Sequence, residues 1–367
     1  MAVPLMDLAP QRAHLRDRLL EAMTSVVDSG RFILGPEVAA FEREAAAYVG
    51  AAHATGVANG TDALVLALRA LGVGPGDRVV CPSYTFYATP EAIAAVGATP
   101  VFVDIEPGTF QLDPAAVERV LDGVRAVVAV HLFGHPAPID RLRAVCDPAG
   151  VPVLEDAAQA IGARLGGRPC GSLGAAATFS FFPTKNLGGF GDGGLVTTDD
   201  PGVEETVRVL RFHGSRDKQT FELVGMNSRL DELQAALLRV LLPELEDWNA
   251  ARRTAADRYR ELGLGELVEL PDVPADTLPI YHLYVVRTAE RERLKAALQE
   301  QGVAATVYYG RPQHLQPVFT HLGYGEGSLP ETERAAREAL ALPMFPTITA
   351  EQQEEVVAGV RSAMALV

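Results

Sequence analysis

Short, nearly continuous apolar runs recur through the first half of the chain and predict strands that are buried on both faces. Helical periodicity marks many of the stretches between them, so the pattern predicts an α/β fold with a mostly parallel central sheet. The expected strands are residues 78–81, 99–103, 126–130, 151–154, 177–181 and 194–198. The expected intervening helices are residues 63–71, 91–96, 114–121 and 139–146.

The two ends of the chain have different patterns. Near the N-terminus, apolar positions spaced three and four apart predict a helix over residues 11–28 and a second helix opened by Pro36. A long helical stretch over residues 229–262 carries Pro243, which predicts either one kinked helix or two helices. The remaining elements indicate a smaller α+β unit. They are strands at residues 282–286 and 305–309, a helix over 290–301 and a closing helix from Ala350.

Length and composition fit this organisation. The 367 residues, of which 48% are hydrophobic, suffice for two packed domains. We expect a large α/β domain over residues 1–245 that includes the N-terminal helices, and a small C-terminal α+β domain over 246–367. The net charge of −15 argues against binding to nucleic acid, because phosphate backbones attract basic surfaces.

The remaining bulk features predict a cytoplasmic protein. No cationic start followed by an apolar stretch indicates a signal peptide, and no apolar run is long enough to span a membrane. The three cysteines, Cys81, Cys146 and Cys170, lack metal-ligand spacing and are interpreted as reduced thiols.

The strongest chemical signal is a lysine in a glycine-rich loop. Lys185 follows an aromatic strand and precedes Gly188, Gly189, Gly191, Gly193 and Gly194, which leave room for a planar ligand. Asp156 comes directly after another apolar strand. A lysine that forms a Schiff base and a carboxylate that keeps a pyridine nitrogen protonated are what pyridoxal 5′-phosphate (PLP) chemistry needs. A lone lysine is usually a solvated surface residue, and Asp156 could also cap a helix.

Other residues complete a candidate cofactor site. Gly60, Thr61 and Asp62 stand at an expected helix start, where backbone N–H groups and the helix dipole favour a phosphate and Thr61 could cap. Ser180 could donate to the same phosphate. Each of these also suits an ordinary capped helix or a plain strand hydroxyl.

Two further side chains are candidates for the ring of the cofactor. Phe86 follows a strand and could stack on the pyridine face, although an aromatic residue in this position is more often part of the core. Gln159 lies close behind Asp156 in the sequence and could hydrogen-bond the ring hydroxyl.

Taken together, these motifs resemble the DegT-type PLP-dependent aminotransferases that act on nucleotide-linked keto sugars. The resemblance runs nearly end to end, over residues 4–8, 35–38, 59–64, 82–86, 130–136, 155–159, 179–188, 191–194 and 342–346. It implies the fold of aspartate aminotransferase (type I), with Lys185 as the Schiff-base lysine and Asp156 against the pyridine nitrogen. Gln159 would contact the ring oxygen and Phe86 would stack on the ring. It places the phosphate on Thr61, Ser180 and the backbone of Gly60 and Asp62.

The resemblance also implies a homodimer whose active sites use both chains. Residues 225–236 match the segment that reaches across, so Asn227 would touch the partner's cofactor phosphate. Many relatives have a tyrosine where this chain has Ser228, and this version is similar to the branch that aminates carbon 3 of a sugar. The implied reaction is a ping-pong transfer from L-glutamate to a dTDP- or UDP-linked 3-keto-6-deoxy sugar, in deoxyaminosugar and antibiotic biosynthesis.

Acceptor contacts and rival functions remain open at this stage. His213, Lys218, Tyr308 and His314 lie in segments that could line the acceptor site, and each is as well explained by a structural role. The acceptor could instead be a 4-keto sugar nucleotide or a keto-cyclitol. A PLP-binding regulatory protein is a further alternative. A PLP-dependent sugar dehydratase is disfavoured because that group has histidine where this chain has Lys185.

Overall fold

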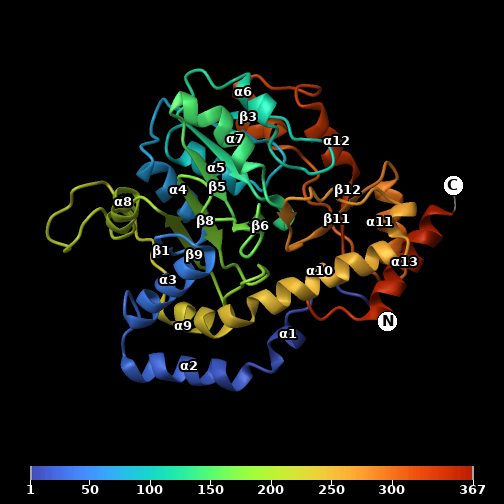
Figure 1. The fold of residues 1–367 in the computed structure, drawn as a ribbon, viewed down its shortest axis with the longest axis horizontal. Helices are drawn as coiled ribbons and strands as arrows, with labels where there is room; N and C mark the ends of the chain where they lie inside the picture. The colour runs from blue at the N-terminus through green and yellow to red at the C-terminus, as the bar shows by residue number, and fades with distance from the viewer. Residues whose placement is uncertain (1, 366–367) are drawn as a thin grey trace.

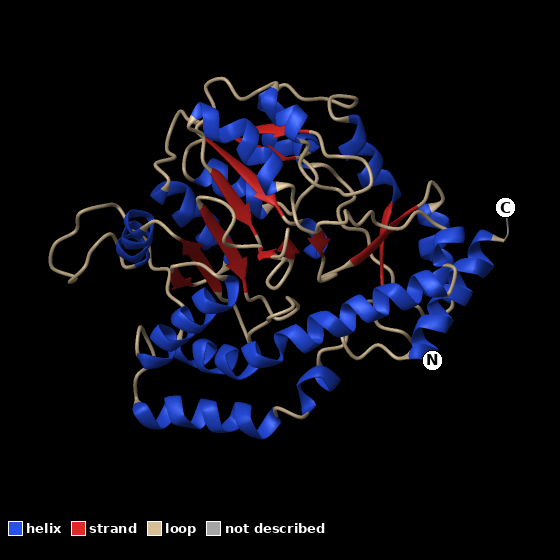
Figure 2. Cartoon of the chain, viewed as in Figure 1, coloured by secondary structure: helices blue, strands red, loops and turns tan. Residues whose placement is uncertain are grey.

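The computed structural model describes residues 2–365 and contains a central seven-stranded sheet. Figure 1 labels its elements, and Figure 2 shows the red strands of the sheet between blue helices. Along the sheet the strand order is β1-β9-β8-β5-β4-β2-β3. Their bounds are β1 His53–Val57, β2 Arg78–Pro82, β3 Thr99–Val103, β4 Ala126–Val130, β5 Val153–Asp156, β8 Ala176–Ser180 and β9 Gly194–Thr198.

The sheet is mostly parallel, as the apolar runs predict. Strands β8, β5, β4, β2 and β3 run parallel to one another, whereas β9 is antiparallel to both β1 and β8. Strand β1 was not expected from the sequence, because its short segment contains glycine and has no continuous apolar run. The carboxyl ends of β4, β5 and β8 therefore lie side by side at one edge, where ligands of such sheets bind.

Helices cover both faces of the sheet. Alternate side chains of one strand enter different cores: Val127 joins one cluster, and Val128 joins the other. The first cluster includes side chains from α2, α3, α7 and α9, and the second includes side chains from α4, α5 and α8. The bounds are α2 Arg16–Ser29, α3 Pro36–Val49, α4 Gly60–Ala70, α5 Ala88–Ala95, α6 Pro114–Glu118, α7 Ile139–Cys146, α8 Pro201–Arg211 and α9 Glu232–Leu241.

The predicted helix over residues 11–28 is divided in the structure. A short helix α1, Ala9–Ala13, precedes α2, and the N–H of Leu15 donates to the carbonyl of Arg12 at 3.0 Å between them. The spacing of apolar residues continues through this turn, so the sequence pattern does not reveal the break between the two helices. The stretch around Pro243 forms two helices, α9 and α10 (Leu245–Glu261), joined by a 3₁₀ turn at Leu242–Glu244.

Helix α10 leads from the large sheet toward a second, smaller set of elements (Figure 1). There β11 (Tyr284–Arg287) pairs antiparallel with β12 (Ala339–Leu342), and α10 contacts α13 (Ala350–Met364). The remaining elements are α11 Arg291–Glu300, α12 Pro330–Glu338 and the short strands β6 Arg164–Leu165, β7 Arg168–Pro169 and β10 Thr277–Leu278. The domain boundary at residue 245 stays a prediction; it falls where α10 begins.

The strand expected at residues 305–309 is wrong. Only Thr306 pairs there, in an isolated bridge to Ala341 on the edge of β12 that β11 leaves free. Tyr309 packs instead against Phe133, with ring centroids 6.4 Å apart. No helix within residues 2–365 is both long and apolar enough to cross a lipid bilayer.

Candidate active site

A cavity of about 770 Å³ opens at the carboxyl edge of the sheet. The last residues of three neighbouring strands line it: Val130 of β4, Asp156 of β5 and Ser180 of β8. Lys185, five residues beyond the end of β8, lines the same cavity. The topology thus brings together the two side chains, Asp156 and Lys185, on which the prediction of PLP chemistry rests.

Lys185 lies on the loop between β8 and β9. Its N–H donates to the carbonyl of Phe182 at 2.8 Å, which closes a tight turn at the lysine. Burial lowers the pKa of Lys185 to about 8, against the opposing effect of the negative charge of Asp156. A minor part of this amine is therefore uncharged at neutral pH and half of it at the pKa, so a nucleophilic neutral form is available under mild conditions.

The lysine loop is also held from the N-terminal segment. The guanidinium of Arg12 donates to the carbonyls of Pro183 at 3.1 Å, Gly188 at 2.8 Å and Gly189 at 3.4 Å. These carbonyls flank Lys185 on both sides, so one side chain fixes the two arms of the loop.

Asp156 is a buried carboxylate with few internal partners. It accepts hydrogen bonds from Thr89 Oγ1 at 2.8 Å and from the N–H of Ala158 at 3.3 Å. Burial raises the pKa of Asp156, and these hydrogen bonds and the charge of Lys185 act in the opposite direction. A cation in the cavity, such as a pyridinium, would stabilise the ionised form. The residues directly after Asp156 form turns and not a helix, so the alternative that Asp156 caps a helix is wrong.

The N-terminus of α4 faces the cavity, but its capping residue differs from the expected one. Asn59, rather than Thr61, is the N-cap, and its side chain accepts from the N–H of Asp62 at 2.8 Å. The donors left for a phosphate are the N–H groups of Gly60 and Thr61, which have no acceptor in the part of the chain that the structure describes. The expectation for the Asp62 backbone therefore does not fit this geometry.

Close packing explains the glycines of this cradle. A Cβ on Gly60 would lie 2.8 Å from the Cβ of Ser180, and one on Gly194 would lie 2.3 Å from the carbonyl oxygen of Asn59. Ser180 thereby reaches the helix start, and its hydroxyl hydrogen remains available to a ligand because its Oγ only accepts, from the N–H of Phe182. Helix N–H donors, a serine hydroxyl, a carboxylate and a poised lysine fit PLP in shape and chemistry.

The two predicted ring contacts also line the cavity. Phe86 is 55% exposed, and its ring centroid lies 6.0 Å from that of Tyr309. The amide of Gln159 is anchored: its Oε1 accepts from the N–H of Phe133 at 2.7 Å and its Nε2 donates to the hydroxyl of Tyr309 at 3.2 Å. One N–H of Nε2 remains for a ligand.

Sequence reasoning missed three residues of the site. Thr89 binds the carboxylate of Asp156, Tyr309 holds Gln159, and His282 lines the cavity from the segment before β11. Thr89 and Asp156 are 67 positions apart in the chain, and Tyr309 and Gln159 are 150 apart, so no local spacing indicates these contacts. His282 comes from a segment outside the large sheet. The one sequence signal for Thr89 is that residues 82–89 directly follow an expected strand.

The four expected acceptor contacts are separated by the fold. Tyr308 lines the cavity. His213 and Lys218 are exposed, on the loop after α8, and do not line it in this chain. His314 is fully buried, with Nδ1 2.7 Å from Ser83 Oγ and Nε2 3.3 Å from Glu333 Oε1. Both of its ring nitrogens are occupied, so its contacts support a structural role rather than an acceptor contact.

Asn227 also lies outside this cavity. It is exposed and lines a neighbouring depression with Gln234, and this depression shares Asn59 and Asp192 with the cavity. This placement is compatible with a contact to a second subunit, and the contact itself stays a prediction.

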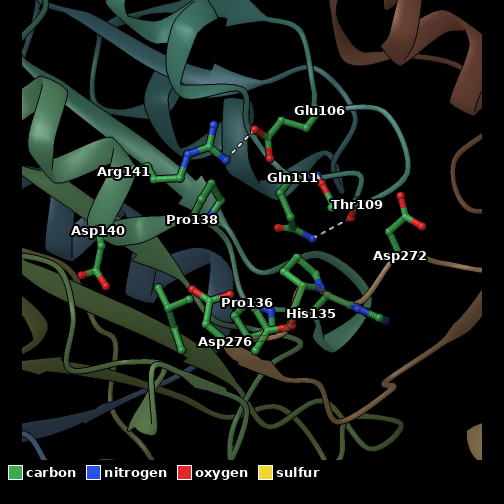
Figure 3. A pocket seen from close by; sticks show the side chains of 13 residues that line it. Glu106, Thr109, Gln111, His135, Pro136, Pro138, Asp140, Arg141, Asp272 and Asp276 are labelled. Atoms are coloured by element: carbon green, nitrogen blue, oxygen red, sulfur yellow. Dashed lines mark hydrogen bonds and ion pairs between the residues drawn. The ribbon is translucent and has the colours of Figure 1, made fainter.

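A second cavity, of about 100 Å³, lies between the start of α7 and the segment before β10. Figure 3 shows its one arginine, Arg141, paired with Glu106 at 2.7 Å, and Gln111 bonded to Thr109. Burial lowers the pKa of the lining His135 to about 4, so this ring is uncharged. The cavity therefore has no free cation for a phosphate and no lysine.

A buried cluster behind the site joins His131, Glu155 and Cys170. Glu155 accepts four hydrogen bonds, one from His131 Nε2 at 2.9 Å and three from backbone N–H groups at residues 171, 173 and 174. The other ring nitrogen of His131 accepts from the N–H of Ala137 at 2.8 Å. With these lone pairs in use, the cluster is a joint between β4, β5 and the following loop rather than a metal site.

Comparison with known proteins connects this geometry to one family. The model of the DegT/DnrJ/EryC1/StrS aminotransferase family matches residues 14–361. A pleiotropic regulatory protein of Geobacillus stearothermophilus is 49% identical, over 97% of both chains. A dTDP-3-amino-3,4,6-trideoxy-α-D-glucose transaminase of Streptomyces venezuelae is 46% identical, over 98% of this chain and 95% of that one. The crystal structure of DesV from S. venezuelae with a ketimine intermediate superposes with a TM-score of 0.96 and 46% identity, over 98% of each chain.

Proposed function

Because the chain belongs to the DegT/DnrJ/EryC1/StrS aminotransferase family, we propose that it transfers the amino group of L-glutamate to a nucleotide-linked 3-keto-6-deoxy sugar. Its cofactor is PLP. The observation that carries the proposal is the convergence of Lys185, Asp156 and the open N-terminus of α4 on one cavity. The 46% identical relative that is named for a dTDP-linked 3-amino sugar supports carbon 3 as the acceptor atom and dTDP as the nucleotide, and UDP is the alternative that we propose.

The chain offers one group for each part of the cofactor. The N–H groups of Gly60 and Thr61 and the hydroxyl of Ser180 would hold the phosphate, and Asp156 would pair with the pyridine nitrogen. Gln159 would bind the ring oxygen and Phe86 would stack on the ring. When bound, PLP supplies the electron sink that makes the hydrogen on an amine-bearing carbon acidic.

Lys185 would carry out the proton transfers. Its Nζ, uncharged in part because burial lowers its pKa to about 8, would take the proton from the amine-bearing carbon of glutamate. In the second half of the cycle the same atom would return a proton to carbon 3 of the sugar. A cavity of about 770 Å³ leaves room for a sugar beside the cofactor, since sites for drug-sized ligands span about 300–1,000 Å³.

The proposal includes a homodimer with shared active sites. The loop after α8 stands away from the sheet (Figure 1) and exposes Phe221, Leu223 and Val224, the last with 87% of its surface accessible. Apolar side chains gathered on one protruding loop favour burial against a partner. Within the dimer, Asn227 would contact the partner's cofactor phosphate.

The same dimer would give His213 and Lys218 a role. Both lie on this exposed loop, and neither lines the cavity of its own chain. We assign them to the acceptor site of the partner, where Lys218 would favour an anionic nucleotide.

The test follows the two half-reactions separately. Purified protein loaded with PLP is treated with L-glutamate, and the visible band of the lysine-bound cofactor should disappear. After removal of the amino acid, a dTDP-linked 3-keto-6-deoxy sugar should restore the band, whereas a 4-keto sugar nucleotide or a keto-cyclitol should not. Lys185→Ala is the control and should show no lysine-bound band at any stage.

The outcomes separate the rival functions. Restoration by another acceptor would retain the aminotransferase and replace the substrate. The 49% identical regulatory protein makes a PLP-binding regulator the second candidate. That function predicts a stable band that glutamate never bleaches, and such a result would overturn the proposal for this donor.

A further inference from the structure

The residue after the lysine begins a buried chain of polar contacts. The Nδ2 of Asn186 donates to Asn249 Oδ1 at 2.8 Å and to the carbonyl of Ile280 at 3.2 Å. Its Oδ1 lies 3.2 Å from Nδ1 of His282. Asn186 is 4% exposed and Asn249, on α10, is fully buried, so these contacts are shielded from bulk water.

Two backbone carbonyls fix the orientation of both amides. The carbonyl of Ile280 can only accept, so the group of Asn186 that faces it is the NH₂. Asn249 is oriented in the same way, because its Nδ2 donates to the carbonyl of Ile161 at 3.1 Å. The oxygen of Asn186 therefore faces His282, and Nδ1 of that ring must carry the hydrogen.

This tautomer leaves a lone pair on Nε2 of His282. The ring lines the cavity that contains Lys185, and Nε2 has no partner among residues 2–365. His282 as a whole residue is 5% exposed. His282 thus brings a ring with one unprotonated nitrogen to the lining of the cavity that contains Lys185.

The backbone of His282 is braced independently of Asn186. Arg252, three positions after Asn249 on α10, donates to the carbonyls of Tyr281 at 3.1 Å, His282 at 3.4 Å and Met344 at 3.0 Å. On the other side, a Cβ on Gly134 would lie 2.7 Å from the N of His282. The backbone that carries the ring is therefore held on two sides, and the contact of Nδ1 with Asn186 holds the ring itself.

The charges around the ring also keep it neutral. Burial and the positive charges of Lys185 and Arg252 lower the pKa of His282 well below its ordinary value. Asn186 and Asn249, which pack against the ring and its brace, carry no charge. The ring also shares its cavity with a carboxylate, because Asp156 lines the same cavity.

We propose that His282 is a positioning residue for Lys185, whose amine donates a hydrogen bond to Nε2 of His282 whenever that amine is not bonded to the cofactor. The inference rests on the proposed function. A free lysine side chain has many rotamers, and a fixed acceptor would keep Nζ aimed at the carbon from which it moves the proton. Asn186 and Asn249 serve this purpose by dictating the tautomer.

The decisive variant is Asn186→Asp, which keeps the shape of the side chain. A carboxylate beside Nδ1 raises the pKa of His282, and the protonated ring turns Nε2 from an acceptor into a donor. We expect the maximal rate constant of the glutamate half-reaction to fall about 10- to 100-fold at low pH and to recover as pH rises. The glutamate concentration that gives half of this rate should change little. Gln299→Glu, an amide-to-acid change on the exposed face of α11, should leave the profile unaltered.

Nitrogen NMR of the histidine side chains gives a readout without turnover. In cofactor-free wild-type protein, His282 should show a protonated Nδ1 and an unprotonated Nε2, and Asn186→Asp should show both protonated. The signal is assigned by its loss in His282→Gln, which also serves if Asn186→Asp does not fold, since it should lower kcat without a new pH dependence.

A wild-type ring with the hydrogen on Nε2, or an equal pH-independent loss in Asn186→Asp and His282→Gln, would overturn the inference. If wild-type protein instead fails to react with glutamate, the proposed function fails, and the NMR result still decides the tautomer.

Discussion

Lys185 loses most of its water shell on folding, and its pKa falls to about 8 from the ordinary value of 10.5 because the charged form is the less stable one in the buried site. The neutral amine, which attacks PLP, is present above the pKa. We therefore expect the rate at which cofactor-free protein captures PLP to rise through pH about 8. Stopped-flow absorbance against pH measures this midpoint, and a midpoint near 10.5 would contradict the burial of the amine.

Asp156→Asn provides the matched variant at the same scale. The negative charge of Asp156 raises the pKa of Lys185, so its removal should move the capture midpoint to lower pH. The final occupancy should fall as well, because the partner of the pyridine nitrogen is lost. A capture midpoint at lower pH together with a lower final occupancy distinguishes an electrostatic role of Asp156 from simple disruption of the fold.

At the scale of the element, the start of α4 works only because it touches the end of β8. Gly60→Ala would place a Cβ 2.8 Å from the Cβ of Ser180 and separate the two walls of the phosphate cradle. We expect the affinity for PLP to fall at least about tenfold, or about 1.4 kcal/mol, in equilibrium titration. Gly74→Ala is the control, since a Cβ there meets nothing within 4 Å and the affinity should be unchanged.

At the scale of the whole molecule, shared active sites predict complementation between two inactive variants. Lys185→Ala and Asn227→Ala would each leave both sites of a homodimer defective. After mixing and subunit exchange, half of the dimers are mixed and one of their two sites is intact, so about a quarter of the wild-type activity should return. Recovery of no activity, with exchange shown by mass spectrometry, would place Asn227 outside the partner's site.

The sequence could predict features that depend on local patterns. The bounds of β3, β4, β9 and α7 agree with their expected ranges, and Lys185 and Asp156 stand out because each follows an apolar strand. The cap of α4 was also readable, since Asn59 stands three positions before Asp62. In contrast, the contact of Asn186 with His282 joins positions 96 apart. Such contacts depend on how α10 and β11 pack against the sheet, which no spacing encodes.

The hydrogen bonds from Arg12 to both arms of the lysine loop have a practical consequence. A protease that cuts within the first turns of the chain would release Pro183, Gly188 and Gly189 from their shared donor and loosen the catalytic loop from outside. Conversely, a lysine tethered to its cofactor should stiffen that loop and shield the N-terminal arm. Resistance of this arm to digestion would then report how much of a preparation is loaded, without any assay of turnover.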